Sequence, residues 1–262
     1  MKLDMLYSTF GDGIYSLLEK IPDYHPKTNI IIIHQVIHEE KYSTIFSQIE
    51  NRNDITYYRI KSKGVTKSRN LALKKSNGDV ILFCDDDITY TKGFQDYILE
   101  QYRIYKNIDF ITFAYSKGTK KLNKFSKIKF NHNLKSILSI GTIEISCRRK
   151  AVTENNVLFP EDMGAGTKYF LCDEPVFLSK ILKNKSKGIY IPYLLCEHPE
   201  ESSGSIFNNH YAYISRLLCF IRIFGIFLGR ILYLIFISKN INKMNSTKDF
   251  IQALSVLFLN IK

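Results

Sequence analysis

Apolar and polar residues follow two different periods along the first hundred residues of the chain. Short runs rich in β-branched residues, such as "NIIIIHQVI" and "VILFC", predict buried strands. Segments with an apolar residue at every third or fourth position, such as "GFQDYILEQYRIY", predict helices. The predicted strands cover 3–9, 29–37, 54–60 and 80–84, and the predicted helices cover 13–21, 40–50, 65–76 and 93–105. Alternating strands and helices indicate an α/β fold with a mostly parallel sheet.

The pattern changes in the second half of the chain. Strands are predicted over 108–115 and 140–149, a helix over 173–184, and a further strand from Gly188 that leads to His198. After Gly204 the residues become strongly apolar and basic. We therefore expect a catalytic domain over 1–205 and a separate C-terminal region over 206–262.

Composition limits the possible partners and compartments. The 262 residues carry a formal net charge of +12, which favours polyanionic partners: nucleic acid, an anionic membrane or a phosphate-bearing substrate. Five scattered cysteines without a C-x-x-C pair argue against a disulfide framework or a zinc site and favour a reducing compartment. The N-terminus has no long apolar stretch, so no secretory signal is expected.

Three consecutive aspartates, Asp85 to Asp87, directly follow the buried run "VILFC". Adjacent carboxylates resist ionising together, so a fold keeps them either in water or around a cation. An acidic surface turn is the simpler reading. In parallel sheets, however, ligands bind beyond the carboxyl ends of the strands, and these aspartates, with His34 and Gln35, lie at such ends. A D-x-D pair at a strand end suits Mg²⁺ or Mn²⁺, which bridges carboxylates to a diphosphate.

Three other features accompany the aspartates. The helix before their strand carries "SRN", with Arg69 and Asn70, and a later loop, "FPEDMGAGTKYFLCDEP", leads to Asp173 and Glu174. His198 follows in "CEHPEESSGS". In this order and spacing the chain resembles a family-2 glycosyltransferase with the GT-A fold, in which a Rossmann-like nucleotide-binding half precedes an acceptor half. The similarity spans about residues 3 to 205.

The resemblance assigns roles around the donor. Asp85 would lie near the ribose or base of a nucleotide sugar, and Asp86 would assist. Asp87, with Asp85 as the other member of the pair, would bind Mn²⁺ or Mg²⁺. His198 would be a further metal ligand or a diphosphate contact, although a loop histidine held by hydrogen bonds is an equal alternative.

The same resemblance extends to the preceding strand and helix. His34 and Gln35 occupy the end of the family's first nucleotide-contacting strand, where other residues are usual. Arg69 and Asn70 would orient the aspartates or contact the nucleotide. A plain surface arginine on a basic helix is the alternative for Arg69.

The mechanism that the family implies is inverting transfer, with a carboxylate as general base. The family's base is the second member of a Glu-Asp pair, so Glu174 takes that position here and Asp173 the first. The structural alternative is that Asp173 caps the helix and Glu174 favours its dipole. Glu161 and Asp162 form a rival acidic pair, while Glu144 either faces the acceptor or alternates outward.

We therefore expect a hexosyltransferase-like enzyme that uses a UDP-linked nucleotide sugar to extend a surface polysaccharide or lipid-linked glycan. This class of acceptor is inferred from the habit of the family and from the apolar, basic tail. A metal-dependent nucleotidyltransferase also uses paired carboxylates, but the N-terminal "STFGDGIYS" lacks the basic residues of its loop. A non-catalytic basic protein that binds nucleic acid is permitted by the charge. No nucleic-acid module is recognisable, so no such partner is expected.

The tail contains a 21-residue apolar run over 217–237, about the length that spans a bilayer. Arg222 and Arg230 interrupt it, and each would cost about 3 kcal/mol near the bilayer centre. This favours an amphipathic helix on the inner, cytoplasmic face of a membrane, with the arginines and Arg216 against anionic head groups. Packing on the catalytic domain and a true span are the alternatives.

Overall fold

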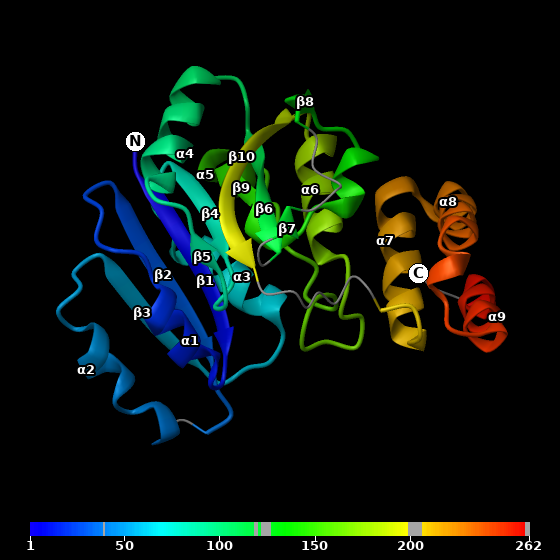
Figure 1. Ribbon diagram of the computed structural model, residues 1–262, viewed down its shortest axis with the longest axis horizontal. Coiled ribbons are helices and arrows are strands. Elements are labelled where there is room, and N and C mark those ends of the chain that lie inside the picture. Colours follow the sequence, from blue (N-terminus) through cyan, green and yellow to red (C-terminus); the bar gives the residue numbers. More distant parts are fainter. Residues whose placement is uncertain (39, 118–119, 122–126, 199–205, 260–262) are drawn as a thin grey trace.

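The computed structural model describes residues 1–38, 40–117, 120–121, 127–198 and 206–259. Within them, a ten-stranded mixed sheet forms the centre of the molecule, and the C-terminal helices lie at the end opposite β3 (Figure 1). The strands follow the order β3-β2-β1-β4-β9-β6-β10-β5, with β7 beside β6 and β8 beside β10.

The N-terminal half has the predicted alternation of strands and helices. Its parallel strands are β1 (Leu3–Phe10), β2 (Thr28–Gln35), β3 (Ile55–Ile60) and β4 (Val80–Cys84). Its helices are α1 (Gly13–Lys20), α2 (Ile45–Ile49), α3 (Val65–Lys75) and α4 (Phe94–Ile104). The helix expected over 40–50 is thus reduced to the five residues of α2. The α/β prediction is confirmed.

The second half adds strands in both directions. These strands are β5 (Thr89–Tyr90), β6 (Phe110–Lys117), β7 (Lys120–Lys121), β8 (Phe130–Asn131), β9 (Ile145–Arg148) and β10 (Gly188–His198). Its helices are α5 (Arg149–Thr153) and α6 (Asp173–Lys183). β9 runs antiparallel between β4 and β6. The strand predicted over 140–149 is shorter than expected, because Thr142–Glu144 form a 3-10 turn.

Each face of the sheet has its own apolar core. On one face, side chains such as Ile14 of α1 and Ile98 of α4 pack with Met5 of β1. On the other face, Leu73 of α3 and Phe177 of α6 are buried in a second cluster. This double covering holds the strand ends rigidly, which fixes the position of the loops that follow them.

The apolar run over 217–237 forms a helical hairpin instead of one helix. Gly225, with φ +85°, separates α7 (His210–Phe224) from α8 (Ile226–Lys239), and α9 (Thr247–Ser255) follows. Gly229 lets α8 approach α7 closely, since a Cβ at this position would lie 2.7 Å from the Cα of Ile221. In the described part of the chain, no helix is both long and apolar enough to cross a bilayer.

The hairpin packs on the catalytic half of the chain. Met163, in the loop before α6, and Val176 of α6 share a buried cluster with residues of α7, α8 and α9. The predicted domain boundary at residue 205 lies outside the described residues.

The tail arginines do not form the lipid-facing set expected from the sequence. Arg216 is 5% exposed and lies over the Phe207 ring. Arg222 donates two hydrogen bonds to the carboxylate of Asp162, at 2.8 and 2.6 Å. Arg230 donates to the backbone oxygen of Leu259. These contacts lie within the chain and join segments that are distant in sequence, so the sequence could not indicate them.

Candidate active site

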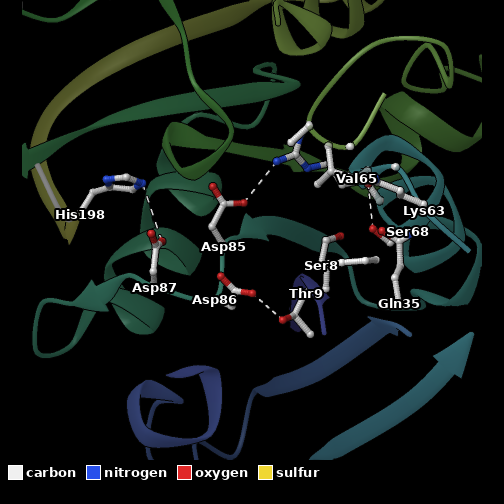
Figure 2. A pocket seen from close by; sticks show the side chains of 15 residues that line it. Ser8, Thr9, Gln35, Lys63, Val65, Ser68, Asp85, Asp86, Asp87 and His198 are labelled. Carbon is white, nitrogen blue, oxygen red and sulfur yellow. Dashed lines mark hydrogen bonds and ion pairs between the residues drawn. The ribbon is translucent and has the colours of Figure 1, made fainter. Parts of the chain in front are cut away.

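A cavity of about 370 Å³ opens beyond the carboxyl ends of the parallel strands. Its walls come from the ends of β1, β2, β4 and β10, from the start of α3 and from the loop around Gly166 (Figure 2). Asp85, Asp86, Asp87 and His198 all line it. The three predicted aspartates therefore gather where parallel sheets bind ligands.

The three aspartates have three different partners (Figure 2). Asp85 accepts a hydrogen bond from Arg69 at 3.2 Å, and Asp86 accepts one from the hydroxyl of Thr9. Asp87 lies 3.7 Å from Nε2 of His198, measured from its Oδ1. Burial raises the pKa of Asp86, and the negative charges of Asp85 and Asp87 raise it further, whereas the hydrogen bond from Thr9 opposes the shift. Asp86 is therefore an anchor of the acidic turn, while its two neighbours face the cavity with looser contacts.

Arg69 joins the aspartate turn to the start of α6. Its guanidinium donates to Asp173 at 2.8 Å and to Asp85 at 3.2 Å, and Nη1 lies 3.7 Å from Glu174. The residue is only 5% exposed, so it is not the surface arginine of the alternative reading. Burial opposes its charge, but the three carboxylates outweigh burial and raise the pKa of Arg69. The buried guanidinium of Arg69 thus pairs with two acidic clusters that lie far apart in sequence, the aspartate turn and the start of α6.

Asp173 and Glu174 differ in exposure. Their side chains are 4% and 18% exposed, and neither lines the cavity. Burial and the charge of Glu174 raise the pKa of Asp173 to about 8, against the attraction of Arg69. Thr142 donates a hydrogen bond of 2.5 Å to Oε1 of Glu174. The helix begins at Asp173 after Cys172, and the Asp173 carboxylate is held by Arg69 rather than acting as a helix cap.

The region around Asp87 fits a divalent cation. Oδ1 of Asp87 is buried without a hydrogen-bond partner, and a carboxylate oxygen in that state is a natural cation ligand. The His198 imidazole is the nearest second ligand, whereas Asp85 turns toward Arg69. No group of three carboxylate, histidine or cysteine side chains among the described residues completes a site by itself. The two protein ligands suit an ion whose other ligands come from water or a phosphate group.

Only some of the residues predicted at the end of β2 and on α3 line the cavity. Gln35 lines the cavity and donates to Ser62 at 2.7 Å. His34 does not line it, because it is fully buried and both of its ring nitrogens are engaged, by Tyr57 and by the backbone oxygen of Gly11. Burial also lowers the pKa of His34. His34 therefore stabilises the fold and does not take the position of the predicted nucleotide contact.

Asn70 likewise faces away from the cavity. Its amide donates to the backbone oxygen of Phe159 and to Glu161, and its side-chain oxygen accepts from the backbone nitrogen of Phe159. Asn70 therefore fixes the start of the glycine-bearing loop and does not orient the aspartates as predicted. Both members of the rival acidic pair are therefore held by other side chains: Glu161 accepts a hydrogen bond from Asn70, and Asp162 accepts one from Arg222. Glu144 is buried and accepts from the backbone nitrogen of Gly141.

Several residues of the site were missed by sequence reasoning. Thr9 and Lys63 line the cavity, and Thr142 holds Glu174. The position of Thr9 at the end of β1 was a usable signal, because Asp85 to Asp87 end a neighbouring strand. Thr142 gave no signal, since its segment was taken for a strand.

Comparisons with known proteins agree with this arrangement. The sequence profile of glycosyl transferase family 2 matches residues 8–161, more than half of the chain. No curated protein matches. The fold is similar to that of TarS from S. aureus, with a TM-score of 0.68 and 15% identity, over 97% of this chain and 49% of that one. The chain thus spans about half the length of that TarS chain.

Two further structures were determined as complexes. A TarS chain in complex with UDP-GlcNAc matches with a TM-score of 0.68 and 14% identity, over 98% of this chain and 80% of that one. The mannosyltransferase PcManGT from Pyrobaculum calidifontis, in complex with GDP-Man and Mn²⁺, matches with a TM-score of 0.56 and 15% identity, over 97% and 68%. At such identities the likeness concerns the fold. The family match and the fold together establish that the chain belongs to glycosyl transferase family 2 and has the GT-A fold.

Proposed function

We propose that the chain transfers a sugar, with inversion, from a UDP-linked donor to a hydroxyl group of a glycan or lipid-linked acceptor. The observation that carries the proposal is the cavity at the strand ends, where Asp85 to Asp87 meet Arg69. The family membership supports glycosyl transfer. The TarS complexes with UDP-GlcNAc and with UDP support a uridine nucleotide as the donor group.

Asp87 and His198 would hold a divalent ion, Mn²⁺ or Mg²⁺, in this proposal. The buried, unpartnered Oδ1 of Asp87 supports this, as does the Mn²⁺ named for the PcManGT complex. An ion bound there would neutralise negative charge on the leaving diphosphate. Asp85, held by Arg69 through Oδ1, would accept a hydrogen bond from the donor's ribose on its other oxygen.

Glu174 would act as the general base. The acceptor oxygen forms a bond to the anomeric carbon, the bond from that carbon to the diphosphate oxygen breaks, and the acceptor proton passes to Glu174. Three observations favour Glu174 over Asp173: its greater exposure, the Thr142 hydrogen bond that orients it, and the pairing of Asp173 with Arg69. Glu174 does not line the cavity but lies 3.7 Å from Arg69, which does, so the acceptor would approach from the side of Glu174.

The acceptor belongs to surface polysaccharide or lipid-linked glycan biosynthesis in this proposal, with the enzyme at the cytoplasmic face of a membrane. The support is the apolar and basic composition of residues 206–259, which pack against the acceptor half.

A screen of nucleotide sugars tests the donor. UDP- and GDP-sugars are added to the full chain with and without Mn²⁺, and thermal stabilisation and sugar release are measured. We expect one class of UDP-sugar to raise the melting temperature and to be hydrolysed slowly in the presence of Mn²⁺. Stabilisation by no nucleotide sugar would contradict the proposal.

A further inference from the structure

The outer side of α8 is apolar although it is exposed. Phe227 is 80% exposed, and five other apolar side chains of this helix are 41–58% exposed. We call this set the α8 face: Ile226, Phe227, Leu228, Ile231, Leu234 and Ile235. The opposite side of α8, with Gly229, Tyr233 and Ile237, is buried. Figure 1 shows α7 between α8 and the rest of the molecule, so the α8 face points away from the catalytic half.

This distribution is unusual for a helix in water. A surface helix normally has one apolar side toward the core and a polar side toward solvent. Single exposed apolar residues are common, but a contiguous group marks a surface that contacts another molecule or a membrane. The α8 face therefore requires a covering partner.

Charge decides which partner fits. Residues 206–262 contain seven lysines and arginines and a single acidic residue, Asp249. The arginines Arg216, Arg222 and Arg230 are engaged by contacts within the chain, so the exposed positive charge of the described residues 206–259 comes from Lys239, Lys243 and Lys248. A second copy of the chain would bring identical positive charges together. An anionic lipid surface offers both an apolar layer and opposite charge.

We propose that the α8 face is a docking surface for an anionic lipid bilayer. The helix lies in the plane of the interface, with its apolar side chains among the acyl chains and the three lysines near the lipid phosphates. This mode of binding needs no helix that crosses the membrane, in agreement with the short helices of the hairpin.

The docking surface is rigidly connected to the acceptor side of the site. α7 carries Arg222, whose paired hydrogen bonds hold Asp162 at the start of the glycine-bearing loop. Val176 of α6, two residues after Glu174, is buried against the same helical cluster. The orientation of α8 on a bilayer would therefore fix the approach of an acceptor, and this last step rests on the proposed function.

The test uses the full chain, because removing residues after 205 would expose Met163 and Val176. Purified protein is sedimented with vesicles of phosphatidylcholine alone or of phosphatidylcholine with phosphatidylglycerol. We expect binding to the anionic vesicles that weakens as salt is raised. The double variant Phe227→Glu/Ile231→Glu should bind at least about tenfold more weakly, because it removes two apolar anchors and adds two negative charges.

The matched control is Ile104→Glu, which makes the same kind of change at a 57% exposed position in α4. It should bind vesicles as the unchanged protein does, and thermal unfolding should show that all variants fold. Unchanged binding of the double variant, or no binding of the unchanged protein to anionic vesicles, overturns the proposal. A dimer in solution that the double variant abolishes would also overturn it in favour of a second copy on the α8 face. Because vesicle binding is measured without a sugar donor, its outcome is independent of the proposed activity.

Discussion

Two acidic clusters share one arginine, yet they differ in nearly every physical property. Asp85 and Asp87 have side chains that are 31% and 41% exposed, whereas Asp173 and Glu174 are 4% and 18% exposed. The first cluster keeps a buried carboxylate oxygen without a hydrogen-bond partner, and the second is held by Arg69 and Thr142. Carboxylates thus serve two roles in this molecule: those of the open cluster can take a cation, whereas those of the closed cluster are oriented by hydrogen bonds, and burial raises the pKa of Asp173.

The largest effect is expected from breaking the link between the clusters. Arg69→Met removes the guanidinium that pairs with Asp85 and with the buried acidic pair at the start of α6, so this pair loses its compensating charge. We expect a loss of about 3–5 kcal/mol in the free energy of unfolding, measured by urea denaturation. Arg69→Lys keeps the charge but loses the planar fork, and should be intermediate. A loss below about 1 kcal/mol for Arg69→Met would mean that the clusters are independent.

The next effect separates the two members of the closed cluster. Glu174→Gln keeps the size of the side chain but cannot accept a proton, so transfer should fall by about 10²-fold or more with donor binding near normal. Asp173→Asn should have a smaller effect on transfer, since its carboxylate is paired with Arg69. Steady-state kinetics with the identified donor provide the measurement. If Asp173→Asn is the more damaged variant, the roles of the pair are reversed.

A smaller effect is expected from Thr142, which orients Glu174. Thr142→Val preserves shape and removes the 2.5 Å hydrogen bond, and a hydrogen bond to a charged group is worth about 1.5–3 kcal/mol. We expect kcat to fall by about tenfold or more while KM for the donor is unchanged. Thr142→Ser should restore the activity. A rise in KM for the donor instead would place Thr142 on the donor side.

The last prediction concerns the dependence of stability on pH. The pKa of Asp173 is raised from its ordinary value of 3.8 to about 8, so the folded state binds a proton that the unfolded state has released. The stability from this proton is present below pH 4 and is lost as pH rises toward 8. Melting temperatures of the unchanged protein should therefore fall more steeply between pH 5 and 8 than those of Asp173→Asn. Parallel curves would contradict the raised pKa.

Much of the donor half could be predicted from sequence because its signals are local. β-branched runs and helical spacing identify β1 to β4 and the helices between them, and the strand "VILFC" fixes where Asp85 to Asp87 must lie. The carboxyl ends of parallel strands meet at one edge of the sheet, and this rule predicts that residues following these strands lie close together. The position of Asp85 to Asp87 at the cavity could therefore be predicted from the strand that precedes them.

Contacts between distant segments could not be predicted. Arg69 and Asp173 are 104 positions apart in the chain. The sequence of a basic helix does not indicate which of its arginines is buried between carboxylates. His34 was misplaced because its strand is buried on both faces, so side-chain alternation gave no inside and outside. The end of α7 at Gly225 could not be predicted, because the apolar run continues on both sides of this residue and its composition does not indicate a turn.

The central claim is that Asp87 provides a metal ligand for the donor diphosphate. The direct measurement is calorimetric titration of UDP into the full chain with Mn²⁺ or with EDTA. Asp79→Asn is the matched control, since Asp79 lies at the opposite end of the same strand and its side chain is 61% exposed. We predict that the unchanged protein and Asp79→Asn bind UDP at least about tenfold more tightly with Mn²⁺, whereas folded Asp87→Asn shows no such gain. A full Mn²⁺-dependent gain in Asp87→Asn would contradict the account.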